Sequence, residues 1–89
     1  MWLHEVLGSK TKERILRRLA EDPGRDFYSR ELSRTIGMSH AAVSSQISPL
    51  VKAGLVEEGE RGRMKFYKLA DNEKTDIIRR LLRLFPVKE

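Results

Sequence analysis

Residues 39–56, SHAAVSSQISPLVKAGLV, contain a helical pattern with two unlike faces. Four large aliphatic residues recur at helical spacing and predict an inward face: Val43, Ile47, Leu50 and Val51. The opposite face carries small or polar side chains and one lysine: Ala41, Ser45, Ser48, Pro49 and Lys52. Pro49 removes one backbone hydrogen bond, which costs about 3 kcal/mol inside an ordinary helix, so we expect the helix to kink or to divide there. Gly54 predicts its end.

A second, shorter helix is predicted just before this one, in the stretch YSRELSRTIGMS. Ser29 is a good N-cap residue, and Leu32 and Ile36 lie one helical turn apart. Gly37 fits the left-handed residue that ends a helix, and Ser39 fits the cap of the next one. Two helices joined by a three-residue turn that contains glycine form the helix-turn-helix pattern.

An earlier helix is predicted in residues 9–24, SKTKERILRRLAEDPG. Ser9 can cap it, and the Asp-Pro-Gly sequence that follows Glu21 stops it. Its apolar residues also fall at helical spacing: Ile15, Leu16, Leu19 and Ala20. Phe27 and Tyr28 then form a candidate for a very short strand.

The stretch LVEEGERGRMKFYKL, which follows the longest helix, is typical of a β-hairpin. We predict strands over residues 55–58 and 64–69, with Gly59 and Gly62 bracketing the tip. The tip between the two glycines holds Glu60 and Arg61. Asn72 can then cap a last helix.

Together these patterns predict a mainly α fold with a small β-hairpin, in the order helix, short strand, helix, helix, strand, strand, helix. We expect one domain over residues 1–89, with a core over 7–69 and terminal helices over 1–7 and 73–85. Three stretches, taken together, carry a resemblance to a known family: LGSKTKERILRRL, YSRELSRTIGMSHAAVSSQISPLVKAGLV and EEGERGRMKFYKL. With them, residues 7–69 resemble the winged helix-turn-helix domain of ArsR/MarR-like transcriptional regulators.

The resemblance implies a DNA-binding transcriptional regulator whose hairpin is the wing. The helix from Ser39 would enter the major groove, where small side chains permit close approach and a methyl group can touch thymine. The residues that would face DNA from this helix are Ser39, His40, Ala41, Ser44, Ser45, Gln46 and Ser48. The candidates for contacts with phosphates are Arg30, Arg34, Lys52, Arg61, Arg63 and Lys65. An arginine of the wing could also enter a narrow minor groove. The alternative for each is an ordinary solvated surface residue.

The composition favours a polyanionic partner, nucleic acid first. Lys and Arg number 18 against 13 Asp and Glu, which gives a formal net charge of +5. Cysteine is absent, and His4 and His40 stand far apart, so we expect no metal and no cofactor. No paired nucleophile and base or phosphate loop is present, so we expect no enzyme.

No apolar run approaches the roughly 20 residues that a membrane span needs. The first residues, MWLHEVLGSK, lack the pattern of an export signal, so we expect a cytoplasmic protein that does not bind membranes. Gln46 and Asn72 are the only side-chain amides among many charged residues, which points to a thermophilic source.

Apolar residues at both chain ends predict a homodimer held by its terminal helices. They are Trp2, Leu3, Val6, Ile77, Ile78, Leu81, Leu82 and Phe85. Left exposed, they would form a patch of the kind that marks an association site. The alternative is that the two ends pack on each other within one monomer.

Two further functions stay open, because a fold alone does not fix a function. The domain could be a protein-interaction or assembly module of a larger machine. It could also bind RNA through the basic wing. The uncharged outer face of the helix from Ser39 argues against strong sequence specificity.

Overall fold

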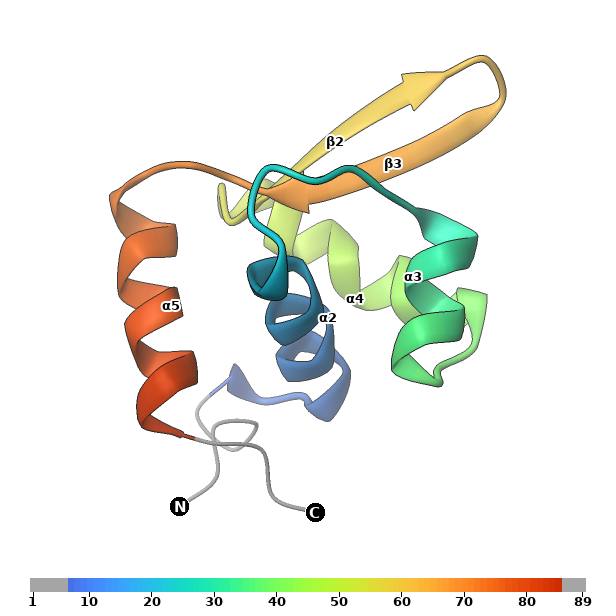
Figure 1. Ribbon diagram of the computed structural model, residues 1–89. Helices are drawn as coiled ribbons and strands as arrows, with labels where there is room; N and C mark the ends of the chain where they lie inside the picture. The colour runs from blue at the N-terminus through green and yellow to red at the C-terminus, as the bar shows by residue number, and fades with distance from the viewer. Residues whose placement is uncertain (1–6, 86–89) are drawn as a thin grey trace.

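The computed structural model describes residues 7–85. The elements are α2 (Lys10–Glu21), β1 (Phe27–Tyr28), α3 (Ser29–Ile36), α4 (His40–Lys52), β2 (Val56–Arg61), β3 (Met64–Leu69) and α5 (Glu73–Leu84). The predicted order is confirmed over this range. The predicted helix over residues 1–7 lies outside the described part of the chain, except for Leu7, which is helical. Figure 1 shows α2 between α5 and α3, with the hairpin of β2 and β3 projecting away from α5.

The start of α3 differs from the prediction by one residue. The N-cap is Tyr28, in extended conformation and without a side-chain cap, so the prediction that Ser29 caps this helix is wrong. Ser29 is instead the first helical residue. The predicted end is confirmed, because Gly37 has a φ of 69° and the Met38 N–H donates to the Ser33 carbonyl at 3.0 Å.

Helix α4 runs through Pro49 without dividing. Ser39 caps it, since its hydroxyl oxygen accepts from the Ala42 N–H at 3.1 Å. Pro49 is exposed, which keeps its ring off the packed side of the helix. The predicted inward residues Val43, Ile47 and Leu50 are buried. The helix therefore presents one continuous outer face.

The sheet is antiparallel, with β3 between β1 and β2. Strand β2 continues to Arg61, which pairs with Met64, so the turn lies at residues 62–63. Gly62 has the positive φ of 62° that this tight turn requires. The prediction that Glu60 and Arg61 form the tip is wrong: both lie on the strand.

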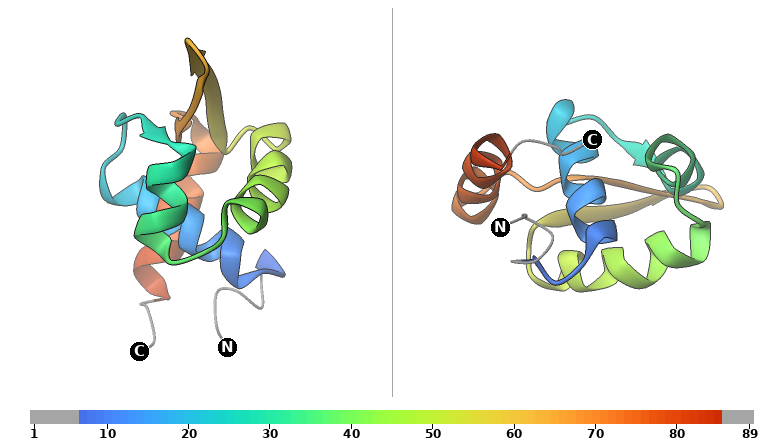
Figure 2. Two further views of the ribbon diagram at one scale, coloured as in Figure 1. Left: turned by 90° about the vertical axis from the view of Figure 1, so that its right-hand side faces the viewer. Right: turned by 90° about the horizontal axis from the view of Figure 1, so that it is seen from below.

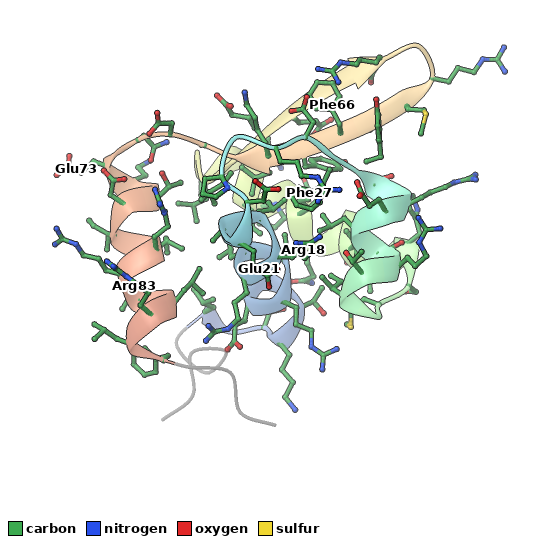
Figure 3. The ribbon with its side chains drawn as sticks, viewed as in Figure 1. Arg18, Glu21, Phe27, Phe66, Glu73 and Arg83 are labelled. Carbon is green, nitrogen blue, oxygen red and sulfur yellow. The ribbon has the colours of Figure 1, made fainter. Side chains whose placement is uncertain are left out.

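One hydrophobic core joins the helices to the sheet. Its fully buried centre contains Ile15, Leu16, Leu19, Phe27, Leu32 and Val43. Tyr67 and Leu69 of β3 close it on the sheet side, as their alternation predicts. Figure 3 shows Phe27 beside α2, where the Arg18 guanidinium lies 4.8 Å from the ring centroid.

Helix α5 packs on this core with one of its faces. Leu82 is 7% exposed and belongs to the core, and Ile78, Leu81 and Phe85 pack against it. The predicted dimer surface is therefore too broad, because Leu82 is covered by its own chain. Ile77 and Leu84 remain 54% and 74% exposed. The prediction for Trp2, Leu3 and Val6 falls outside the described residues.

Candidate nucleic-acid interface

Ahead of Pro49, the outer face of α4 consists of small, uncharged side chains. Residues at helical spacing along it are all exposed: Ala41, Ser44, Ser45 and Ser48. Ser39 and His40 are exposed at its start, whereas Gln46 is half-buried at its flank. The Ser45 hydroxyl donates to the Ala42 carbonyl of its own helix at 3.1 Å, so its oxygen still has accepting capacity.

His40 links the first turns of the two helices of the motif. Its Nε2 lies 3.0 Å from the Ser29 Oγ, and the two residues begin α4 and α3 respectively. This contact fixes the start of α4 against α3. Sequence reasoning missed it because it gave Ser29 a capping role within its own helix.

The candidate cations divide into two groups by their partners. Within residues 7–85, four have no carboxylate partner and are exposed: Arg30, Arg34, Lys52 and Arg63. Lys65 is paired with Glu58 at 3.6 Å, and Arg61 is paired with Asp26 at 2.8 Å. The first group is available to an external anion without loss of an internal contact.

Arg61, at the turn end of β2, belongs to a brace that it forms with Asp26, Tyr28 and Phe66. Its guanidinium contacts Asp26 and also lies 4.4 Å from the centroid of Phe66. The Tyr28 hydroxyl and then the Asp26 carboxylate raise the pKa of Arg61, which is charged at any ordinary pH. The Arg61 guanidinium is therefore already engaged within the chain, and its predicted contact with DNA stays a prediction.

Phe66 is the centre of this brace. Its ring meets that of Tyr28 edge to face, with centroids 6.4 Å apart. Across the hairpin it pairs with Gly59, where an added Cβ would overlap the ring. Gly59 thus makes room for Phe66, and a hairpin tip is not its role. Figure 3 shows the Phe66 side chain on the wing.

The start of α4, helix α3 and the wing gather at one end of the molecule. Figure 2 shows this from two further directions, with α5 at the opposite end. The small face of α4 and the unpaired cations of α3 and of the wing turn therefore belong to the same end of the fold.

No group of three or more histidine, aspartate and glutamate side chains within residues 7–85 could hold a metal ion. The absence of metal and cofactor stays a prediction. Over the same residues, none of the helices has the length and apolarity to cross a membrane.

A family comparison gives this geometry a context. The sequence profile described as bacterial regulatory protein, arsR family, matches residues 9–58, more than half of the 89-residue chain. The chain belongs to this ArsR family. The match begins at the cap of α2 and ends within β2, so it contains the whole helix-turn-helix. The resemblance predicted from the sequence is confirmed.

Two curated relatives support the ArsR assignment. The transcriptional regulator AdcR of Streptococcus pneumoniae is 37% identical over 70 residues, which cover 75% of this chain and 46% of AdcR. ArsR2 of Halobacterium salinarum, named for an arsenical resistance operon repressor, is 34% identical over 74 residues, covering 82% of this chain and 59% of ArsR2. This ArsR-family chain thus spans about half the length of the curated relatives it matches.

A solved structure agrees with the fold. Reduced HlyU from Vibrio cholerae superposes with a TM-score of 0.74 at 26% identity, over 96% of this chain and 86% of HlyU. The homodimeric winged helix-turn-helix DNA-binding domain Mb0332 from Mycobacterium bovis superposes with a TM-score of 0.70 at 22% identity, over 90% of this chain and 70% of that domain, which confirms the winged helix-turn-helix fold.

Proposed function

We propose that this ArsR-family chain is a DNA-binding transcriptional regulator that places the first turns of α4 in the major groove. The observation that carries the proposal is the small outer face of α4 beside exposed cations that lack ion-pair partners within residues 7–85. Small side chains let the helix backbone approach the base edges, and methyl groups contact thymine. Few donors on this face imply a modest sequence preference.

Phosphate contacts come from the cations around the small side chains of α4. Four cations without an ion-pair partner in the described part of the chain can take this role: Arg30 and Arg34 on α3, Lys52 at the end of α4 and Arg63 in the wing turn. Such contacts position a protein on the duplex without reading its sequence. Arg61 contributes less, because contact with a phosphate competes with Asp26.

The regulator acts as a homodimer through the exposed apolar side of α5. Ile77 and Leu84 lie seven residues apart, close to one side of the helix, and are exposed in the single chain. A closed two-fold pair is the commonest oligomer. It would place two α4 helices on half-sites about 10 base pairs apart, or a multiple of that spacing.

The proposal includes neither catalysis nor a bound metal, and it places the protein in the cytoplasm with DNA. The proposal depends on exposed residues of α3, α4 and the wing, and binding DNA through such a surface requires neither a catalytic group nor a metal ion. The protein-interaction and RNA-binding alternatives have no comparable observation in their favour.

Selection from random DNA duplexes tests the function. We expect enrichment of a near-palindromic motif, and a log–log salt dependence of affinity with a slope of about −0.9 for each phosphate contact. Flat enrichment without duplex binding would contradict the proposal and favour a protein partner. Binding of RNA but not of duplex DNA would favour the third function.

Ser45→Leu tests the role of α4 within the same assay. The side chain is exposed, so the substitution leaves the core intact. We expect affinity for the selected motif to fall more than affinity for a random duplex, because the larger side chain obstructs the fit against base edges. Equal losses on both duplexes would show that α4 positions the protein without reading the sequence.

A further inference from the structure

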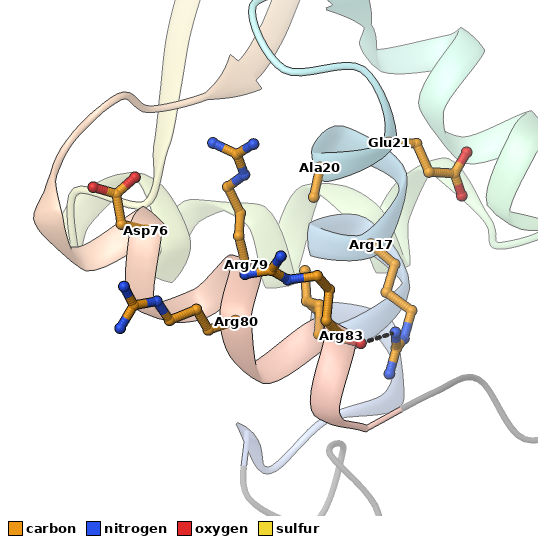
Figure 4. A pocket seen from close by; sticks show the side chains of 8 residues that line it. Arg17, Ala20, Glu21, Asp76, Arg79, Arg80 and Arg83 are labelled. Carbon is orange, nitrogen blue, oxygen red and sulfur yellow. Dashed lines mark hydrogen bonds between the residues drawn. The ribbon is translucent and has the colours of Figure 1, made fainter.

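An arginine-lined groove lies between α2 and α5, away from the proposed DNA surface. Its volume is about 540 Å³, and its lining includes Arg17, Arg79, Arg80 and Arg83, with Leu82 as an apolar element. Figure 4 shows three of these arginines on α5 and Arg17 across from them on α2. The volume suits a small molecule, since ligand pockets span about 300–1,000 Å³.

The α5 arginines lack partners in the described part of the chain. Arg79, Arg80 and Arg83 are exposed and form no ion pair or side-chain hydrogen bond with any of residues 7–85. The groove also contains the carboxylates of Glu21 and Asp76, but Glu21 is engaged by Arg18 at 3.0 Å. The positive charge of the groove is therefore only partly neutralised from within.

Arg17 has a structural role in the groove, because its guanidinium connects α2 to the end of α5. Its guanidinium donates to the Leu82 carbonyl at 2.9 Å, drawn as a dashed line in Figure 4, and to the Phe85 carbonyl. It is also paired with Glu13 at 3.0 Å. These contacts join the end of α5 to α2, so the two walls of the groove are held together without a ligand.

The spacing on α5 suits an anion with more than one charge. Arg79 and Arg83 are four residues apart, so they are neighbours on the helix surface and repel each other. An anion between them relieves that repulsion. Guanidinium groups match the geometry of phosphate and carboxylate oxygens and form paired hydrogen bonds to them.

Two arginines of the groove, Arg79 and Arg83, lie apart from both other proposed surfaces. The groove opens on the side of α2 away from α4, which passes behind α2 in Figures 1 and 4. With 3.6 residues per turn, Arg79 and Arg83 lie about 130° around the helix from Ile77 and Leu84. A second copy docked on those apolar residues leaves Arg79 and Arg83 open, whereas Arg80 lies only about 40–60° from them around the helix.

We propose that this groove binds a small oxyanion with two or more negative charges, carried by phosphate or carboxylate groups. The site is independent of DNA binding, because its residues lie outside the surface assigned to the duplex. Anion binding can therefore be measured without DNA, and its result does not depend on the proposed regulator function.

Titration of the full 89-residue chain, followed by NMR of backbone amides, tests the site. The probes are inorganic triphosphate for phosphate and citrate for carboxylate, with sodium chloride added to hold ionic strength constant. We expect saturable shifts confined to α5 and the end of α2, with one probe bound more tightly than the other. Acetate, with a single charge, should give no saturation. Shifts that grow linearly for every probe, or that spread over all basic surfaces, would overturn the proposal.

Matched charge variants separate a site from general attraction. Arg79→Gln with Arg83→Gln removes two groove cations, and we expect binding about tenfold weaker or worse, because charge-assisted contacts are lost. Arg30→Gln with Arg34→Gln removes the same charge from α3 and should leave the affinity of the probes nearly unchanged. Equal weakening by both pairs would overturn the proposal. Because all four side chains are exposed, both double variants should fold, and the amide spectra report this directly.

Discussion

The Arg61 guanidinium lies 2.8 Å from the Asp26 carboxylate, across 35 positions of sequence. The same guanidinium covers the Phe66 ring, so the wing is tied to the loop that precedes β1. Two residues further on, Arg63 occupies the turn without an ion-pair partner in residues 7–85. Two arginines of one hairpin therefore have opposite roles, one internal and one available.

Arg63→Ala should weaken duplex binding with little effect on stability. Loss of one phosphate contact flattens the log–log salt slope by about 0.9. Arg61→Ala should change that slope less and lower the free energy of unfolding only slightly, since the ion pair and ring contact are exposed. Salt titrations and urea unfolding of both variants measure these effects. An equal change of slope in the two variants would show that Arg61 leaves Asp26 for the phosphate.

Buried Tyr67 predicts a loss of stability at alkaline pH. Burial raises the pKa of its hydroxyl above the ordinary value of 10.0, and the Glu58 carboxylate adds to the rise. Below pH 10.0 both states hold the proton and stability is unaffected by this group. Above it the unfolded state loses the proton first, so the free energy of unfolding falls until the raised pKa is passed.

Tyr67→Phe should remove this part of the alkaline loss. Urea unfolding at pH values below and above 10 measures it as a smaller decrease than in the unsubstituted chain. Tyr28→Phe is the control, because it changes a tyrosine of the same sheet and leaves Tyr67 in place. An identical decrease in the Tyr67 variant and the control would contradict the assignment.

Local signals predicted much of this fold, because caps and glycine ends act within a few residues. Ser9, Gly37 and Ser39 all have their expected roles. The hairpin turn could not be placed in this way, since Gly59 and Gly62 are both suitable turn residues. What decides between them is the Phe66 ring opposite Gly59, a contact across strands that sequence spacing does not reveal.

The sequence predicted where the candidate site lies better than it predicted the contacts of its side chains. Exposure of the α4 face follows from helical periodicity, so Ala41, Ser45 and Ser48 lie where expected. The partners of Arg61 and His40 come from residues distant in sequence, and their geometry appears only after packing. Likewise, α5 has a wide apolar stripe, and only its docking on α2 separates buried Leu82 from exposed Leu84.

Asn72 should contribute to stability through both ends of its amide. Its oxygen accepts from the Thr75 N–H at 3.0 Å in a capping box, and its nitrogen donates to the Gly54 carbonyl at 2.8 Å. Asn72→Ala should lower the free energy of unfolding by about 1–2 kcal/mol. Asn72→Asp keeps the cap and loses only the donor to the Gly54 carbonyl. Urea unfolding should therefore give it a stability between those of the unsubstituted chain and of the alanine variant. A loss as large as that of alanine would show that the contact with Gly54 dominates.

Ile77→Gln with Leu84→Gln should convert a dimer into a monomer. Both side chains are exposed in the single chain, so removal of their apolar surface weakens association without opening the core. Glutamine leaves the net charge at +5, and any loss of duplex affinity then cannot come from altered attraction to phosphates. A substitution at Leu82 would instead damage the core and obscure the result.

Sedimentation at micromolar concentration should show the unsubstituted chain as a dimer and the variant as a monomer with weaker binding to a two-half-site duplex. Affinity for a single half-site should be nearly equal in the two proteins. An unsubstituted chain that sediments as a monomer would remove the basis for paired half-sites, whatever its affinity for DNA.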